Sequence, residues 1–182
     1  MSTLNLYLFQ FIFGLSHRNF FVDDLGVFLA QYLPYLLVLG ALIFVFLFEG
    51  WKKRILVLSE GLMALILSRG IITEVIRFFY HSPRPFQALN LSALINEPSY
   101  SFPSGHAALF FALATTIFYL SRRLGWWFFA LATANGLARI FVGVHWPFDI
   151  VGGAVVGIVS AMLIHKLLEP IAKQVEEQPK SA

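Results

Sequence analysis

The sequence predicts an all-α integral membrane protein, a helical bundle of five transmembrane helices preceded by a short N-terminal interfacial helix. Of its 182 residues, 58% are hydrophobic and only 13% are charged, which leaves too little polar surface for a soluble domain of this length. Five mostly apolar stretches are close to or above the length of roughly 20 residues that a helix needs to cross a bilayer. They are residues 22–48, 55–80, 104–120, 126–142 and 148–168.

The two ends of the chain differ from these spans. Residues 4–15 are apolar, but about a dozen residues are too few to cross a membrane, so we expect an interfacial helix. They lack a basic leading region and an Ala-x-Ala cleavage site, which argues against a signal peptide. We interpret residues 1–168 as one membrane-embedded domain. Residues 169–182 turn polar, contain Pro170 and Pro179, and are predicted to form a cytoplasmic tail.

Lysine and arginine are distributed unevenly between the two ends of the predicted spans. Eight of them fall on one side of a five-span chain: Lys52, Lys53, Arg54, Arg122, Arg123, Lys166, Lys173 and Lys180. The positive-inside rule makes this side, and with it the C-terminus, cytoplasmic. The net charge of +3 is therefore mainly a topology signal, and nucleic acid is not a predicted partner.

Three stretches that are distant in the sequence reach the opposite, extracytoplasmic face. Residues 77–85 close the second span, residues 102–106 open the third, and residues 139–149 join the fourth span to the fifth. Because all three lie at the same depth in the membrane, we expect them to form one site.

The first two stretches suit the binding of an anion. Arg84 stands between Pro83 and Pro85, which push its backbone towards extended geometry. Ser104 is placed to cap the third span, and Gly105 permits close approach to the backbone. The free N–H groups and the positive dipole end of that helix attract anions.

Two histidines complete the predicted site. His106 lies in the first turn of the third span. His145 precedes Asp149 by four residues, so the carboxylate can orient and charge-stabilise the imidazole. Pro147 suits the first helical position of the fifth span. A second histidine can supply the proton that a leaving oxygen needs.

Three arginines face one carboxylate in this constellation, which favours a dianionic or trianionic ligand. The guanidinium forks of Arg77, Arg84 and Arg139 match phosphate oxygens bidentately. Phosphoryl transfer needs little beyond positioning and charge stabilisation. The sequence therefore predicts hydrolysis of a phosphate ester or anhydride.

Other interpretations are open on the residues alone. Ser104 and His145 could form the dyad of an intramembrane serine protease, although peptide hydrolysis has no need for three arginines. The protein could bind or transport a lipid phosphate without catalysis, or His106, His145 and Asp149 could hold a metal ion. Four residues outside the site are interpreted as structural: His17, His81, His165 and Arg18.

The motif spacing resembles that of the type 2 phosphatidic acid phosphatase (PAP2) family, from the second span onward. The family's signatures are Lys-x6-Arg-Pro, Pro-Ser-Gly-His and Ser-Arg-x5-His-x3-Asp. The matching residues here are Arg77, Arg84 and Pro85; Pro103, Ser104, Gly105 and His106; and Ala138, Arg139, His145 and Asp149. Arg77 replaces a lysine and keeps the cation, whereas Ala138 replaces a serine and lacks its hydroxyl.

The resemblance implies a helical bundle and a two-step mechanism without a metal or other cofactor. His145 would attack phosphorus and form a phosphohistidine, and Asp149 would hold its tautomer. His106 would protonate the leaving group and then activate water. Five residues would cradle the phosphoryl oxygens: Arg77, Arg84, Arg139, Ser104 and Gly105.

Within the family, the short chain and residues 14–19 with Asp23 are similar to bacterial undecaprenyl-diphosphate phosphatases of the bacitracin-resistance type. Residues 143–147 also fit this group, which often carries Asp where Gly105 stands. The resemblance implies undecaprenyl diphosphate as substrate, in the bacterial cytoplasmic membrane, as part of peptidoglycan biosynthesis. Phosphatidylglycerophosphate, phosphatidate and lipid A phosphates are the alternatives among polyprenyl and glycerolipid phosphates.

Arg69 and Glu74 interrupt the second span, and charges within a bilayer usually face the interior of the bundle. Glu74 and Arg77 are three residues apart on a helix and can pair. We expect Arg69 to pair across to another span near Asn135.

Overall fold

The computed structural model describes residues 2–47 and 50–177, where the regular elements are all helical. The first helix is α1 (Thr3–Phe13). One long helix then comprises α2 (Phe20–Val27), the π-helical η1 (Phe28–Tyr32) and α3 (Leu33–Phe46). A second comprises α4 (Trp51–Leu65), the π-helical η2 (Ile66–Ile72) and α5 (Thr73–Phe79). The remaining helices are α6 (Pro85–Ala88), α7 (Gly105–Leu120), α8 (Arg122–Phe141) and α9 (Pro147–Glu177).

Three of these helices are long and apolar enough to cross a membrane: Phe20–Phe46, Trp51–Phe79 and Pro147–Gln174. The predicted all-α architecture is confirmed. α7 is apolar but has 16 residues, and α8 carries Asn135 and Arg139 within its apolar run. The count of five spans therefore stays a prediction. Phe48, at the end of the first predicted span, lies outside the described residues.

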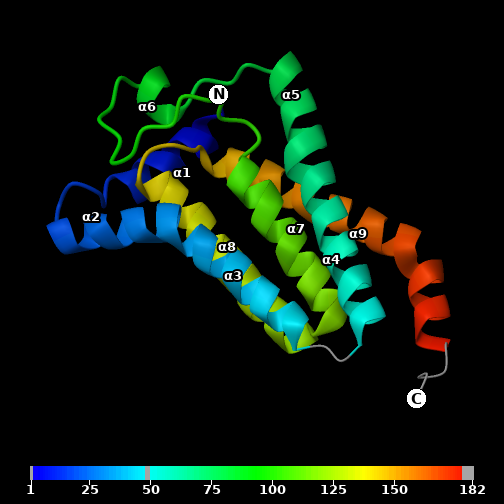
Figure 1. Cartoon of the computed structure of the whole chain (residues 1–182). Coiled ribbons are helices and arrows are strands. Elements are labelled where there is room, and N and C mark those ends of the chain that lie inside the picture. The colour runs from blue at the N-terminus through cyan, green and yellow to red at the C-terminus, as the bar shows by residue number, and fades with distance from the viewer. Residues whose placement is uncertain (1, 48–49, 178–182) are drawn as a thin grey trace.

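α7 packs closely against α9, and the two helices begin side by side (Figure 1). Gly153 and Gly157 of α9 make this approach possible. A Cβ added to Gly153 would lie 2.4 Å from the carbonyl oxygen of Ser104, and one on Gly157 would lie 2.3 Å from that of Ala108. Small residues thus bring the two backbones into contact. At the helix starts, Ser104 N donates a hydrogen bond to Asp149 O at 3.0 Å.

α1 lies across the end of α8 and the start of α9 (Figure 1). Its Phe9 is fully buried against Ile140 and Trp146. The side-chain oxygen of Asn5 accepts a hydrogen bond at 3.1 Å from the backbone N–H of Phe148, one of the free donors at the start of α9. The N-terminal helix therefore supports the same end of the bundle at which α9 begins.

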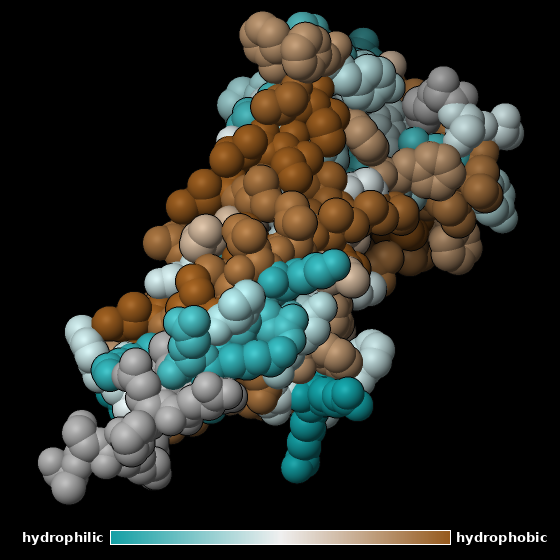
Figure 2. Space-filling model, turned by 90° about the vertical axis from the view of Figure 1, so that its right-hand side faces the viewer, coloured by the Kyte–Doolittle hydropathy of each residue, from teal (hydrophilic) through white to brown (hydrophobic). Residues whose placement is uncertain are grey.

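The two ends of the bundle carry different polar residues. The end of α3, the starts of α4 and α8, and the C-terminal end of α9 lie together at one end (Figure 1). Seven of the eight predicted cytoplasmic cations belong to these segments, while Lys180 lies outside the described residues. Figure 2 shows a broad apolar band between hydrophilic residues at this end and the opposite end of the bundle. The three motif stretches lie at that opposite end.

α9 continues beyond Leu168 to Glu177, with Pro170 inside the helix. Glu169 and Lys173 pair at 2.7 Å on its exposed surface. Residues 169–177 of the polar C-terminal segment are therefore helical, and Pro179 lies outside the described residues.

Candidate active site

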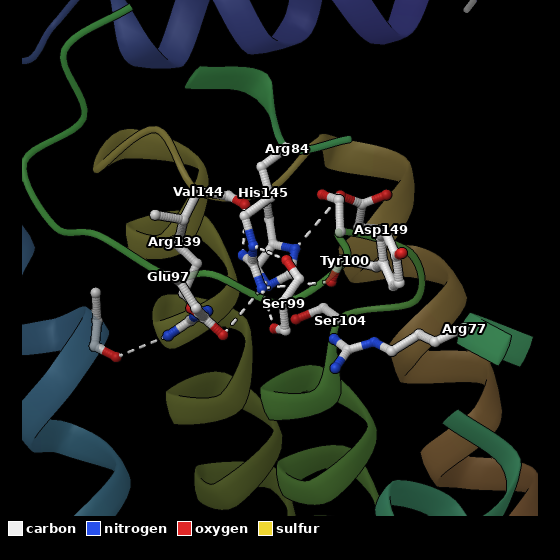
Figure 3. A network of polar contacts seen from close by, with 12 residues as sticks. Arg77, Arg84, Glu97, Ser99, Tyr100, Ser104, Arg139, Val144, His145 and Asp149 are labelled. Atoms are coloured by element: carbon white, nitrogen blue, oxygen red, sulfur yellow. Dashed lines mark hydrogen bonds and ion pairs between the residues drawn. The ribbon is translucent and has the colours of Figure 1, made fainter. Parts of the chain in front are cut away.

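The three motif stretches meet where α7 and α9 begin (Figure 3). Arg84 and His145 are fully buried there, and Arg139 is 2% exposed. Arg77 reaches the same place from α5, with its guanidinium directed towards Ser104 in Figure 3. Three segments far apart in the sequence thus surround one small volume. This agrees with the expectation that stretches at the same depth in the membrane form one site.

Arg84 is fixed by hydrogen bonds on several sides. Its Nε donates to Ser99 O at 2.6 Å, its Nη1 to Val144 O at 2.7 Å, and its Nη2 to the Ser99 hydroxyl at 2.9 Å. Its backbone is extended (φ −73°, ψ 156°), as the flanking prolines predict, and α6 begins at Pro85. These contacts place Nη1 at 3.3 Å from Nε2 of His145.

His145 and Asp149 form the expected pair. Nδ1 of His145 lies 3.3 Å from Oδ2 of Asp149, which also accepts hydrogen bonds from Trp146 N at 2.8 Å and from the Ser101 hydroxyl. The carboxylate favours the tautomer with the proton on Nδ1, which leaves the lone pair of Nε2 facing Arg84. Burial lowers the pKa of His145 well below its usual value, and the neighbouring arginine charges lower it further. The imidazole is therefore neutral at pH 7 and can act as a nucleophile.

The turn between α8 and α9 explains why His145 faces the site. Gly143 has φ of +90°, a conformation that side chains other than glycine's rarely adopt. A Cβ at Gly143 would also lie 2.9 Å from the ring of Phe13. Pro147 then opens α9, as predicted, with Asp149 in its first turn. His145 is thereby held between two helices.

The Pro-Ser-Gly-His stretch forms the start of α7. Ser104 Oγ accepts a hydrogen bond from Ala107 N at 3.4 Å, so Ser104 caps the helix as predicted. Nη2 of Arg77 donates to Pro103 O at 3.0 Å, which brings a guanidinium to this helix start. His106 lies in the first turn of α7.

Glu97, in the loop between α6 and α7, joins the site although none of the sequence motifs includes it. Its Oε1 lies 3.0 Å from Nη2 of Arg84, and its Oε2 pairs with Nη2 of Arg139. Burial raises the pKa of Glu97, but the charges of Arg139 and Arg84 outweigh burial and lower it, so the carboxylate is ionised. The one signal in the sequence was an acidic residue between the motif that carries Arg84 and the Pro-Ser-Gly-His motif.

A pocket of about 380 Å³ lies beside Arg139, with His106 and Glu97 in its wall. Residues 30–32 and 35 of the first long helix complete much of the lining. Nε of Arg77 and Nε of Arg139 are buried without a hydrogen-bond partner among the described residues. Buried donors of this kind favour an anionic acceptor. Of these two arginines only Arg139 lines the pocket, and its charge together with His106 makes the pocket suited to a phosphate group.

The predicted partner of Arg69 is wrong. Arg69 pairs with Glu74, whereas Asn135 donates hydrogen bonds to Leu29 O at 2.7 Å and Ala30 O at 3.3 Å. π-helical turns account both for the partner of Arg69 and for the partners of Asn135. Leu29 and Ala30 lie within η1, where the regular backbone hydrogen bonding of the first long helix is interrupted, and their carbonyl groups accept from Asn135. In η2 the backbone hydrogen bonds join residues five apart, which brings Arg69 and Glu74, also five residues apart, towards the same side of the helix.

The histidines interpreted as structural lie outside this cluster. His17 contacts the backbone of the α6–α7 loop, with Nε2 at 3.0 Å from Ser92 O. His81 packs against Tyr100 with ring centroids 4.5 Å apart. His165 stacks on a tyrosine ring near the opposite end of the bundle.

Long apolar helices, and guanidinium groups gathered around a neutral histidine, define the protein as a membrane-embedded phosphatase. The PAP2 superfamily matches residues 60–172, and the chain belongs to this family. The chain is 33% identical over 173 residues to the undecaprenyl-diphosphatase BcrC of Bacillus subtilis, covering 92% of this chain and 87% of that one. It is 34% identical over 165 residues to the bacitracin transport permease protein BcrC of Bacillus licheniformis, covering 90% and 80%.

The fold is also similar to a solved structure. The crystal structure of LpxE from Aquifex aeolicus superposes with a TM-score of 0.73 at 29% sequence identity. The match covers 91% of this chain and 96% of LpxE. The similarity thus extends over nearly the whole chain.

Proposed function

We propose that this protein is a lipid phosphatase that hydrolyses undecaprenyl diphosphate to undecaprenyl phosphate and inorganic phosphate. The observation that carries the proposal is the orientation of His145, with Nδ1 at Asp149 and Nε2 beside the guanidinium of Arg84. A neutral imidazole nitrogen next to a phosphate-binding arginine is suited to in-line attack on phosphorus.

The proposed reaction has two steps. Nε2 of His145 attacks the terminal phosphorus, the bond to the bridging oxygen breaks, and His106 protonates that oxygen as the lipid phosphate leaves. Asp149 stabilises the charge on the imidazole. Water then attacks the phosphohistidine, with His106 as the base, and releases phosphate. Five residues bind the phosphoryl oxygens in this scheme: Arg77, Arg84, Arg139, Ser104 and Gly105.

The proposed topology follows from the two ends of the bundle. The cation-rich end would face the cytoplasm, with the C-terminal segment 169–182 beside it. The site would then open on the extracytoplasmic face of the bacterial cytoplasmic membrane. α7 and α8 would complete five spans in a single domain of residues 1–168, and α1 would lie in the interface. This side of the membrane is where a lipid diphosphate remains after its cargo has been transferred.

The substrate assignment is supported by the two relatives named BcrC, one of which is called an undecaprenyl-diphosphatase. Phosphatidylglycerophosphate, phosphatidate and lipid A phosphates are the alternatives. A serine protease is disfavoured because Nδ1 of His145 faces Asp149 and its Nε2 faces Arg84, so neither ring nitrogen is paired with the hydroxyl of Ser104.

Purified protein should release phosphate from undecaprenyl diphosphate faster than from the alternative lipid phosphates when all are presented in the same detergent. Excess EDTA should leave the rate unchanged, because the proposed chemistry uses only side chains. A faster rate on phosphatidylglycerophosphate would reassign the substrate. Loss of activity in EDTA that added divalent metal restores would replace the proposed mechanism by a metal-dependent one.

The pH dependence of turnover should be bell-shaped. His145 attacks only when neutral, and its lowered pKa means that stronger acid is needed to protonate it. The acid limb of kcat/KM should therefore lie below the usual histidine value of about 6.5. The alkaline limb should appear in kcat and follow loss of the proton that His106 carries in the enzyme–substrate complex, where the bound phosphate dianion favours the charged imidazole. Initial rates of phosphate release test this, and a flat profile between about pH 5 and 9 would contradict both assignments.

A further inference from the structure

Two pockets adjoin at His106. The first is the pocket beside Arg139 described above. The second has a volume of about 220 Å³ and is lined by Arg69 and His106 together with apolar side chains. Gln31, Tyr35 and His106 border both pockets. The imidazole that is proposed to protonate the leaving oxygen therefore stands at the boundary between two binding volumes.

The second pocket combines one cation with an apolar wall. Pro34 and Val38 of α3 form one part of this wall, and Leu109 and Phe110 of α7 form another. Such a lining suits the first units of a hydrocarbon chain. The pocket beside Arg139 instead has the polar wall described above. The pocket beside Arg139 is thus polar, like the phosphate end of a lipid phosphate, and the second pocket is largely apolar, like its hydrocarbon end.

Arg69 is brought into the second pocket by η2 and by the absence of a side chain at Gly105. A Cβ at Gly105 would lie 2.4 Å from Nε of Arg69 and 3.0 Å from its Cζ. The guanidinium therefore lies directly against the first turn of α7, one residue from His106. The side chain of Arg69 is 39% exposed, so a ligand in the pocket can reach it.

The charges around Arg69 leave a positive surplus. Oε1 of Glu74 pairs with Arg69 and also lies 3.4 Å from Nη1 of Arg77. One carboxylate oxygen is thus shared between two guanidinium groups. An arginine has five N–H donors, so Arg69 retains donors for a second anion.

We propose that Arg69 forms a second phosphate subsite, which binds the phosphate that stays on the lipid when a prenyl diphosphate is cleaved. This inference rests on the proposed function. The terminal phosphate lies beside Arg139, the bridging oxygen at His106, and the lipid phosphate beside Arg69, with the first prenyl units on the apolar wall. When the N–P bond to His145 forms, the bridging oxygen departs with the lipid phosphate and takes the proton of His106. A lipid monophosphate has no second phosphate to place there, so Arg69 sets a preference for diphosphates.

Arg69→Gln tests the subsite with farnesyl diphosphate and farnesyl monophosphate, which carry the same chain. We expect kcat/KM for the diphosphate to fall about 30-fold, which corresponds to the loss of one charge-assisted hydrogen bond. We expect kcat/KM for the monophosphate to fall less than about threefold. Arg69→Lys, which keeps the charge, should recover part of the loss. Arg123→Gln, which removes an exposed arginine at the opposite end, is the matched control.

Product inhibition separates the subsite from a merely structural role. Farnesyl monophosphate should inhibit the Arg69→Gln variant more weakly than the wild type, while the inhibition constant of inorganic phosphate should not change. Equal losses on both substrates, or weaker inhibition by inorganic phosphate, would assign Arg69 to support of Arg77 and overturn the subsite alone. Wild-type protein that hydrolyses monophosphates but not prenyl diphosphates would overturn the proposed substrate and the subsite with it.

Discussion

Replacing His145 with alanine should reduce phosphate release by at least about 10,000-fold, the scale seen when a covalent nucleophile is removed. The variant would retain the arginines but would lose the nitrogen that attacks phosphorus. Because His145 is fully buried, its replacement also leaves a cavity. His145→Gln and a thermal unfolding measurement on both variants would show whether the fold survives.

The same substitution tests the covalent intermediate. Wild-type protein quenched during turnover of substrate labelled in the terminal phosphate should retain acid-labile label, and the His145 variants should not. His17→Gln removes an exposed histidine at the same end of the bundle and should keep both the label and the activity. Substantial phosphate release by a folded His145→Ala variant would mean that another group attacks phosphorus.

Replacing Arg84 with alanine should lower kcat/KM by roughly 100- to 1,000-fold, about 3–4 kcal/mol of transition-state stabilisation by analogy with lost oxyanion donors. Arg84→Lys should recover little. The guanidinium of Arg84 donates hydrogen bonds to the carbonyl groups of Ser99 and Val144, and these bonds fix Nη1 beside His145. A single ammonium group cannot make all of these contacts at once. Steady-state phosphate release measures both effects.

The control for Arg84 is Arg18→Ala, which removes an exposed arginine outside the site and should change kcat/KM by less than about twofold. Near-wild-type activity of Arg84→Lys would show that only the charge at this position matters. Similar losses in the Arg18 and Arg84 variants would point to a general electrostatic effect in place of a specific phosphate contact.

The features that the sequence predicted correctly depend on local chemistry. A serine before a helix accepts its N-cap hydrogen bond, a proline opens a helix, and a spacing of four residues brings His145 to Asp149. Topology then places these local features at one end of the bundle. Helix ends and turns therefore determined most of the candidate site.

The features that the sequence did not predict depend on tertiary context. Glu97 lies in a loop without a periodic pattern, so its position between Arg84 and Arg139 emerges only when the loop folds over the helices. The partner of Arg69 depends on a π-helical turn, which hydrophobic periodicity does not reveal. The number of spans stays a prediction because α7 is short and α8 carries buried polar groups.

The position of Glu97 has a consequence for ligand affinity. In the resting protein this carboxylate acts as an internal counter-ion for two guanidinium groups that would otherwise repel each other in a buried setting. On the proposed function, an incoming phosphate would exchange with a resident anion and would not enter a vacant positive field. The measured free energy of phosphate binding would then be the difference between the phosphate–arginine and Glu97–arginine ion pairs. We therefore expect the loop that carries Glu97 to influence how readily the site releases its products.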